Sequence, residues 1–338
     1  MTTIRARGWC RVDLAGGTLD IWPLGLFHRD ARTVNVTVAL PVMVTMRSGV
    51  GQWVVEQAGE RIESDDLATL ATQPGTALVA LVAEACGLEP CHITIDSGSP
   101  RGAGLGASSA LTVALIAAAE CVAGRFAIDH DVEPVAPRWV RLARDLEARM
   151  MRLPTGLQDH FPSLHGGVLD IRHQPGGEQV DRLAVDLEAL TERMLVVYTG
   201  QSHISAKSNW HVVRARLDDE PRLHEPFATI AEVAAALPEA LEAGDWARVG
   251  ALVRREHDHR RQLGPDVSTP TIEHWLTEAE RLGAWGGKVC GAGGGGSIVV
   301  LCPPGRKASI ETALTDLGGT VLHAPPTAAR LELDSLPA

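Results

Sequence analysis

A glycine-rich segment, PRGAGLGASSA at residues 100–110, constrains this chain more than any other feature. It follows the alternating stretch HITID at residues 92–96, which predicts a strand, and it leads into a long apolar run that predicts a buried helix. Glycines let the backbone approach an anion closely, and the free N–H groups at the start of a helix bind phosphate. The segment therefore predicts a phosphate-binding loop.

Two common phosphate-binding patterns do not fit this segment. No Gly-Lys-Ser/Thr ends it, so it is not a Walker A loop. No acidic residue about twenty positions further on ends a second strand, which disfavours a dinucleotide fingerprint. The hydroxyls of Ser108 and Ser109 can add contacts to phosphate or to Mg²⁺. A glycine-rich turn without a ligand is the alternative.

Charge and composition exclude several classes of function. The 338 residues suffice for one large or two ordinary domains, and the net charge of −11 disfavours sequence-independent nucleic-acid binding. The longest apolar stretch, near residues 110–124, is too short to span a membrane, and no apolar signal region follows the N-terminus. Six cysteines without a CxxC pair suit a reducing compartment. We therefore expect a cytoplasmic protein that binds neither nucleic acid nor membrane.

Strand and helix patterns are mixed along the chain. Residues 4–55 look rich in strands, and helical spacing recurs at about 204–216, 226–243, 245–262 and 270–284. Because strands and helices do not alternate strictly, we expect an α+β fold. We place a domain boundary before the strand pattern at 194–199, which divides the chain into residues 1–190 and 191–338.

Three motifs in order resemble those of the GHMP kinases, the superfamily of galactokinase, homoserine kinase, mevalonate kinase and phosphomevalonate kinase. The segment 100–110 resembles their phosphate loop, Pro-x-x-x-Gly-Leu-Gly-Ser-Ser-Ala, although Ala107 stands where the family usually has its first Ser. RVDLAGGTLD at residues 11–20 resembles the start of the sugar kinases. KVCGAGGGGS at residues 288–297 resembles the third motif, which lies beside the phosphate loop.

This resemblance implies a fold and a pair of cofactors. The fold would have two domains, with a left-handed βαβ unit in the N-terminal ATP-binding domain and a ferredoxin-like C-terminal domain. ATP, with Mg²⁺, would meet a small-molecule sugar or sugar phosphate in the cleft between them. The residues expected to hold ATP are Pro100, Gly102, Gly104, Leu105, Gly106, Ala107, Ser108 and Ser109.

A fourth segment, GLQDHFPSLHGG at residues 156–167, resembles the one that carries the family's catalytic aspartate, which corresponds to Asp159. A carboxylate there could accept the substrate's hydroxyl proton, and Arg11 could keep it ionised. Glu147 resembles the glutamate that joins the loop serine, here Ser108, in holding Mg²⁺. Glu147 could equally be one exposed helix charge among several.

The sugar would contact the first motif. Asp20 matches an acidic residue that binds sugar hydroxyls in galactokinase-like enzymes, and a carboxylate can accept two such donors. The expected contacts are completed by Gly16, Gly17, Thr18 and Gly293. Leu19 replaces the Thr, and Gly17 the Glu, of galactokinase, which weakens the case for galactose.

The resemblance is most specific to bacterial D-glycero-D-manno-heptose 7-phosphate kinases, on three features: AGG at 15–17, QDH at 158–160 and YTGQSHISAK at 198–207. Arg11 in place of the mevalonate-type Lys favours phosphorylation of an anomeric hydroxyl, giving a 1,7-bisphosphate. A kinase for fucose, galactose or a uronic acid, and a non-catalytic sugar sensor, are the alternatives. The oligomeric state stays open, a dimer being one option.

A 7-phosphate would need cations, and the local candidates in the sequence are His28, Arg29, Arg32, His203 and Lys207. Trp22 follows Asp20 and is a candidate lining of the sugar site. The stretch REHDHRR at residues 255–261, with His257 and His259, reads as the solvated face of a helix rather than as a metal site.

Overall fold

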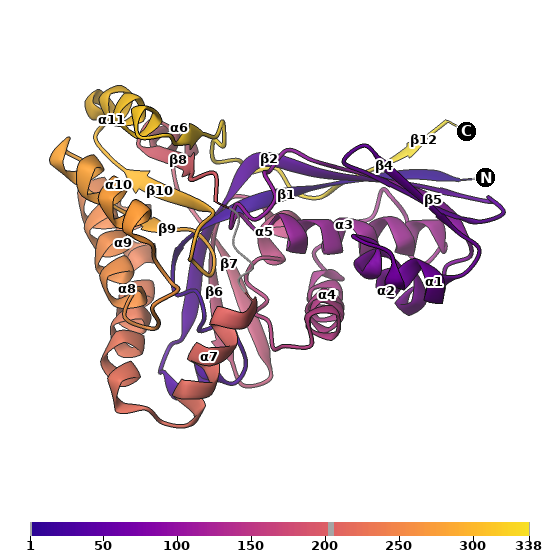
Figure 1. Ribbon diagram of the computed structural model, residues 1–338, viewed down its shortest axis with the longest axis horizontal. Coiled ribbons are helices and arrows are strands. Elements are labelled where there is room, and N and C mark those ends of the chain that lie inside the picture. Colours follow the sequence, from indigo (N-terminus) through magenta and orange to yellow (C-terminus); the bar gives the residue numbers. More distant parts are fainter. Residues whose placement is uncertain (1, 202–205, 338) are drawn as a thin grey trace.

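The computed structural model describes residues 2–201 and 206–337, which form two sheets with helices packed against them (Figure 1). The expected α+β class is confirmed, because strands and helices are mixed along the chain without strict alternation. Among the described residues, no helix is long and apolar enough to cross a membrane.

The first sheet has eight strands, in the order β12-β1-β2-β5-β3-β4, with β6 pairing β2 and β7 pairing β6. The β3–β5 pair is parallel and the other pairs are antiparallel. The strands are β1 (Thr3–Ala15), β2 (Arg32–Ser48), β3 (Trp53–Gln57), β4 (Glu60–Ser64), β5 (Cys91–Ser97), β6 (Val168–Gln174), β7 (Gly177–Leu183) and β12 (Glu332–Leu336).

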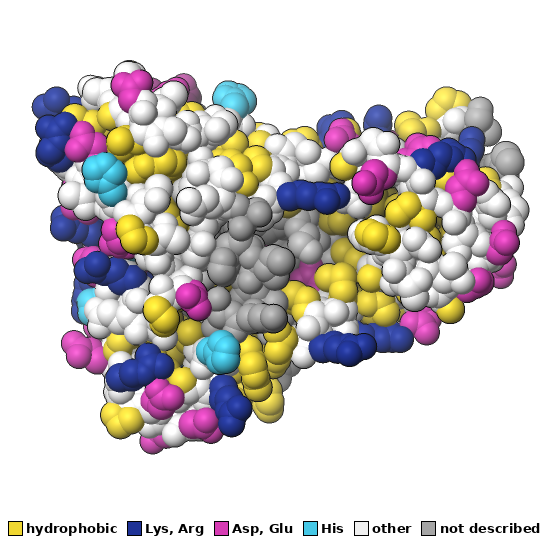
Figure 2. All heavy atoms as spheres, viewed as in Figure 1, with side chains coloured by type: hydrophobic (Ala, Val, Ile, Leu, Met, Phe, Trp, Pro, Cys, Tyr) yellow, Lys and Arg dark blue, Asp and Glu magenta, His cyan; other side chains and the backbone are white. Residues whose placement is uncertain are grey.

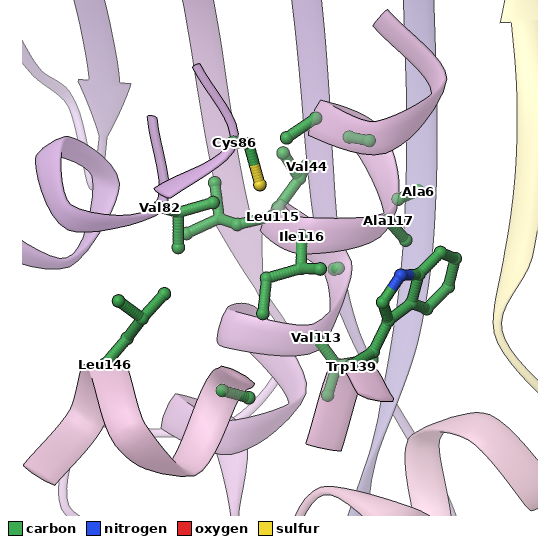
Figure 3. Close-up of a cluster of buried hydrophobic side chains, with 14 of the residues drawn as sticks. Ala6, Val44, Val82, Cys86, Val113, Leu115, Ile116, Ala117, Trp139 and Leu146 are labelled. Atoms are coloured by element: carbon green, nitrogen blue, oxygen red, sulfur yellow. The ribbon is translucent and has the colours of Figure 1, made fainter. Parts of the chain in front are cut away.

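Helices cover one face of this sheet (Figure 1). They are α1 (Leu67–Thr72), α2 (Ala77–Ala85), α3 (Ala107–Val122), α4 (Ala136–Met151) and α5 (Phe161–His165). Helix α3 is apolar on nearly every side because it lies between the sheet and the helices α2 and α4. Leu115 and Ile116 of α3 pack among Val82, Trp139 and Leu146 (Figure 3). This core fixes the start of α3, where the glycine-rich loop ends.

The second sheet is antiparallel, in the order β11-β8-β10-β9. Its strands are β8 (Met194–Tyr198), β9 (Gly286–Val289), β10 (Ser297–Leu301) and β11 (Thr320–Val321). The helices in this part of the chain are α6 (Leu187–Thr191), α7 (Ala206–Leu217), α8 (His224–Glu242), α9 (Trp246–Arg260), α10 (Pro270–Arg281) and α11 (Pro304–Asp316). Two single turns, η1 (Leu24–Phe27) and η2 (Pro221–Leu223), complete the described structure.

The end of the chain returns to the first sheet. Strand β12 pairs antiparallel with β1, and both termini lie at the same end of the molecule (Figure 1). Two ion pairs, Arg5–Asp334 at 2.7 Å and Arg7–Glu332 at 2.8 Å, reinforce this pairing. The segment after α11 therefore adds a strand to the N-terminal sheet, and the boundary at residues 190/191 stays a prediction.

The predicted helical segments near 204–216, 226–243, 245–262 and 270–284 are confirmed as α7, α8, α9 and α10. The interpretation of residues 255–261 as a solvated face is wrong for three side chains. Glu256, His257 and Arg260 are buried, because α9 packs against both α8 and β9. His257 pairs with Glu273 at 2.9 Å, and the described residues contain no cluster of His, Cys, Asp and Glu that could hold a metal.

Candidate active site

A cavity of about 560 Å³ joins the segments that the sequence singled out. The glycine-rich loop, the first motif, the loop after α4 and the third motif all contribute to its wall. Each residue predicted to hold ATP lines this cavity: Pro100, Gly102, Gly104, Leu105, Gly106, Ala107, Ser108 and Ser109. On the face that Figure 2 shows, basic and acidic side chains of the described residues are interspersed rather than gathered into one basic stripe.

The glycine-rich loop opens helix α3 without a side-chain cap. Gly106 is the N-cap, with φ of 72°, and Ala107 begins the helix. The first N–H groups of α3 thus have no side chain competing for them and are available to an anion at the cavity wall. A Cβ on Gly104 would lie 2.7 Å from the carbonyl oxygen of Cys290, so the third motif packs directly on the loop.

Arg11 and Asp159 form a two-pronged ion pair at the cavity. Nε of Arg11 donates to Oδ1 of Asp159 at 2.8 Å, and Nη2 donates to Oδ2 at 2.7 Å. Nη1 donates to the carbonyl of Gly104 at 2.6 Å, so Arg11 also ties the carboxylate to the phosphate loop. Burial favours the neutral form of Arg11, but Asp159 and Asp13 outweigh it and raise its pKa. The guanidinium therefore stays charged.

Behind Arg11 lies a chain of buried charges that the sequence did not reveal. Lys288 of β9 contacts Asp13 of β1 at 2.5 Å and Glu256 of α9 at 3.3 Å. Glu256 pairs with Arg260 at 2.7 Å. Burial raises the pKa of Asp13, but Lys288 and then Arg11 lower it below its ordinary value. These charges join the first motif, the third motif and α9.

Asp20 lies in the same cavity and is held by backbone rather than by a cation. Its Oδ2 accepts the backbone N–H groups of Leu157 and Gln158, at 2.9 and 3.1 Å. Burial, followed by the nearby charge of Asp159, raises the pKa of Asp20 to about 6. A Cβ on Gly156 would overlap the Asp20 carboxylate. The loop that carries Asp159 can therefore lie this close to Asp20 only because residue 156 is a glycine.

The other predicted sugar contacts divide into two groups. Gly17, Thr18 and Gly293 line the cavity, whereas Gly16 does not. Gly16 has a φ of 84°, and a side chain on it would overlap the carbonyl of Arg32. This residue is therefore a glycine because the backbone turns here beside Arg32. Thr18 has a φ of 76°, which is strained for a β-branched residue and is a feature of binding sites.

Glu147 is buried, not one of several exposed helix charges. Its carboxylate accepts hydrogen bonds from Thr112 at 2.8 Å and from Ser109 at 3.3 Å. Nε2 of His160 lies 3.3 Å from the same carboxylate. Burial favours the neutral form of both side chains, but the attraction between them outweighs it. This attraction lowers the pKa of Glu147 and raises the pKa of His160. Within the described part of the chain, Ser109 and not the predicted Ser108 donates to Glu147. One carboxylate beside hydroxyls, facing a phosphate loop, is a donor set that suits Mg²⁺.

Three of the five cations predicted for a distal phosphate, His28, Arg29 and Arg32, are described by the structure and do not line the cavity. Arg29 is 97% exposed, Arg32 pairs with Asp170, and His28 stacks on Phe227. His203 lies outside the described residues, and the side chain of Lys207 is not described. Trp22, 73% exposed, is likewise absent from the cavity wall, whereas its neighbour Ile21 lines it.

The cavity residues that the sequence analysis did not name as site residues include Gln158, Arg260 and Arg101. Gln158 adjoins Asp159 in the sequence, so its position was a usable signal. Arg260 comes from a helix about 240 residues after the first motif, and only the tertiary structure brings its guanidinium to Gly17 and Thr18.

Family models match two parts of the chain. Residues 57–167 match the GHMP kinases N terminal domain, and residues 237–319 match the GHMP kinases C terminal model. Together the two matches cover more than half of the chain, and they include the phosphate loop and the third motif.

Individual relatives agree with this family. A mevalonate kinase of Methanothermobacter thermautotrophicus is 31% identical over 225 residues, 67% of this chain and 68% of that protein. The chain spans about two thirds of the archaeal mevalonate kinases it matches, 64–68% of their length. The bifunctional fucokinase/GDP-fucose pyrophosphorylase of Arabidopsis thaliana is 26% identical over 88% of this chain and 30% of that protein.

Solved structures show the same fold. The crystal structure of a D-glycero-D-manno-heptose 1-phosphate kinase from Bacteroides thetaiotaomicron superposes with a TM-score of 0.77, over 99% of this chain and 100% of that one, at 20% identity. The likeness to solved structures shows the fold, and the two family models and the 31% identical relative show the family. This chain belongs to the GHMP kinases.

Proposed function

We propose that this protein is an ATP-dependent kinase that phosphorylates the anomeric hydroxyl of a sugar. The observation that carries the proposal is the pair of Arg11 and Asp159, held between the phosphate loop and the cavity that Asp20 shares. A carboxylate fixed by a buried guanidinium, beside a helix N-terminus open to phosphate, is an arrangement suited to phosphoryl transfer.

In the proposed reaction, the hydroxyl oxygen of the sugar attacks the γ-phosphorus of ATP, and the bond to the β,γ-bridging oxygen breaks to release ADP. The hydroxyl proton passes to the carboxylate of Asp159, which keeps free acceptor positions beyond its bonds to Arg11. Arg11 holds this carboxylate in place and offsets negative charge near the transferring group.

The residues expected to hold Mg²⁺ are Glu147 and a hydroxyl of the loop. The contact between Ser109 and Glu147, at 3.3 Å, makes Ser109 a better candidate than Ser108 for that hydroxyl. When bound, Mg²⁺ would neutralise charge on the ATP phosphates. His160 and Thr112 fix the orientation of the Glu147 carboxylate.

The specific substrate that we propose is D-glycero-D-manno-heptose 7-phosphate. Support comes from the resemblance at residues 15–17, 158–160 and 198–207, and from the likeness in fold to a heptose 1-phosphate kinase. Asp20, with a buried carboxylate oxygen beside the cavity, suits the hydroxyls of a sugar.

Mevalonate is a second candidate substrate, because the archaeal relatives of about 30% identity are mevalonate kinases. Mevalonate carries a carboxylate of its own. The carboxylates of Asp20 and Asp159 would repel an anionic group placed beside them, so this part of the cavity favours the neutral hydroxyls of a sugar.

The proposal is tested by ADP release with ATP, Mg²⁺ and a panel of substrates. The panel contains heptose 7-phosphate, heptose, fucose, galactose, galacturonate and mevalonate. We expect a sugar to give the highest kcat/KM, with heptose 7-phosphate first. Turnover of mevalonate alone would refute the sugar-kinase proposal, and binding of a sugar without ADP release would identify a sensor.

A further inference from the structure

Gln158 has a side-chain amide oxygen that accepts no hydrogen bond from the residues that the structure describes. It is 7% exposed and lines the cavity beside Asp159. Its Oε1 is buried without a hydrogen-bond partner among the described residues. Buried amides are nearly always paired in folded proteins, so an unpaired one at a cavity wall points to a ligand.

Arg260 reaches the same place from helix α9. Its Nε and Nη2 contact Glu256 at 2.8 and 2.7 Å. Nη2 also donates to the carbonyl of Gly17 at 2.8 Å, and Nη1 donates to Oγ1 of Thr18 at 3.3 Å. A guanidinium has five N–H groups. These contacts use four, so one N–H on Nη1 has no acceptor within the part of the chain that the structure describes.

Gly17 brings the two side chains together. A Cβ at this position would lie 2.7 Å from Nη2 of Arg260 and 3.2 Å from Nε2 of Gln158. Both groups therefore flank Gly17, which has no side chain to separate them. The backbone N–H of Gln158 also donates to Asp20, so all three polar groups border one end of the cavity.

The charges at this end are already balanced. Arg260 is paired with Glu256, which is itself paired with Lys288, and Lys288 is paired with Asp13. Asp20 and Asp159 add negative charge nearby. A second phosphate would meet a compensated guanidinium and two carboxylates, whereas a neutral hydroxyl would find both a donor and an acceptor.

We propose that Gln158 and Arg260 form a subsite that recognises a hydroxyl of the sugar other than the one phosphorylated, Arg260 donating to its oxygen and the Gln158 amide accepting its proton. This inference rests on the proposed sugar-kinase function. It assigns the pair to substrate selection, and it leaves the distal phosphate of a heptose 7-phosphate outside their contacts.

The test compares Gln158→Leu with wild type on the 2-deoxy, 3-deoxy and 4-deoxy analogues of heptose 7-phosphate, or of whichever sugar the panel ranks first. A site built to hydrogen-bond a hydroxyl rejects the analogue that lacks it. We expect wild type to lose at least about tenfold in kcat/KM on one analogue, and Gln158→Leu to lose less than about twofold on that same analogue. The matched control is Gln57→Leu, the same change on strand β3 in the same cavity, which should keep the wild-type pattern.

Arg260→Lys gives an independent reading, with thermal melting as the check on folding. It should lose discrimination on the same analogue, because an ammonium cannot reproduce the fork of contacts. Equal discrimination by wild type and both variants would overturn the subsite. A variant that instead stops distinguishing heptose 7-phosphate from heptose would assign the pair to phosphate and refute the hydroxyl. If wild type turns over no sugar at all, the sugar-kinase proposal fails and the subsite falls with it.

Discussion

Two carboxylates of one cavity are held in opposite ways. Asp159 is fixed by the guanidinium of Arg11, whereas Asp20 is fixed by two backbone N–H groups. The two N–H groups that Arg11 donates fix the orientation of the Asp159 carboxylate. Burial favours the neutral form of Asp20 and raises its pKa to about 6. Different environments therefore suit the two residues to different tasks, proton acceptance and sugar binding.

The Asp159→Asn variant tests the first of these tasks. Loss of the proton acceptor should lower kcat by about 10²–10⁴-fold, while the affinity for ATP changes little. The measurement is steady-state kinetics with calorimetry of ATP binding. Asp145→Asn, on the exposed face of α4, is the matched control and should keep wild-type turnover. Near-normal turnover of Asp159→Asn would remove this residue from the mechanism.

Asp20 predicts a dependence of stability on pH. The unfolded carboxyl has a pKa near 3.8 and the folded one a pKa of about 6. As pH rises between about 4 and 6, the unfolded chain releases this proton first, so the folded state loses stability. A shift of about two pKa units corresponds to about 3 kcal/mol.

The Asp20→Asn variant removes this penalty while its amide oxygen can still accept both backbone N–H groups. Urea denaturation should show the variant to be about 1–3 kcal/mol more stable than wild type above pH about 6, and equal to it below about 4. The KM for sugar should rise in the same variant. A stability difference that stays constant across this pH range would show that the pKa of Asp20 is the same in the folded and unfolded states.

At the scale of elements, the start of helix α3 depends on one backbone conformation. Gly106 has a φ of 72°, and a Cβ there would lie 3.3 Å from Cγ of Arg11. Gly124, just beyond the other end of α3, has nearly the same φ of 70° and open space around it. Comparing substitutions at the two glycines therefore distinguishes the effect of backbone strain from the effect of contact with the site.

Gly106→Ala and Gly124→Ala should each cost about 1 kcal/mol in the free energy of unfolding, because both force a side chain into the left-handed region. Only Gly106→Ala should also raise the KM for ATP, by several-fold, since it displaces Arg11 and the loop. An unchanged KM for ATP in a folded Gly106→Ala protein would argue against the loop as the phosphate site.

The buried charges join strand β1, strand β9 and helix α9. Replacing Lys288 by Met would leave Asp13 and Glu256 without their shared cation, which typically costs about 3–5 kcal/mol. Lys307→Met, which removes a single contact with the carbonyl of Thr191, should cost much less. Chemical denaturation compares the two. Similar losses would mean that Lys288 contributes no more than an ordinary surface lysine.

Local patterns predicted most of these elements, but not the contacts between them. The period of apolar residues identified α3 and α7 to α10, and the glycines identified the loop that opens α3. The burial of Glu256 and Arg260 could not be predicted, because α9 looks charged along its length and only its packing against α8 and β9 selects a buried side. The sequence offered both Ser108 and Ser109 as hydroxyl donors, and it could not say which of them contacts Glu147.

At the scale of the whole molecule, the cavity is assembled from segments nearly 300 residues apart. Arg11 comes from the first strand, Asp159 from the loop after α4, and Gly293 from the third motif. The resemblance of three motifs, in the same order, to those of the GHMP kinases predicted that these segments lie together. The return of β12 to β1 was not predicted, because its alternation is weak and its partner is the first strand of the chain.

The central claim is that this assembly transfers the γ-phosphoryl group of ATP to an anomeric hydroxyl. Phosphorus NMR of the product formed from ATP, Mg²⁺ and the preferred sugar tests it most directly, with the Asp159→Asn protein as the blank. We predict a new phosphate resonance coupled to the anomeric proton, and with heptose 7-phosphate a product that carries two phosphates. A phosphate coupled to any other position of the sugar, or found only on mevalonate, would contradict the account.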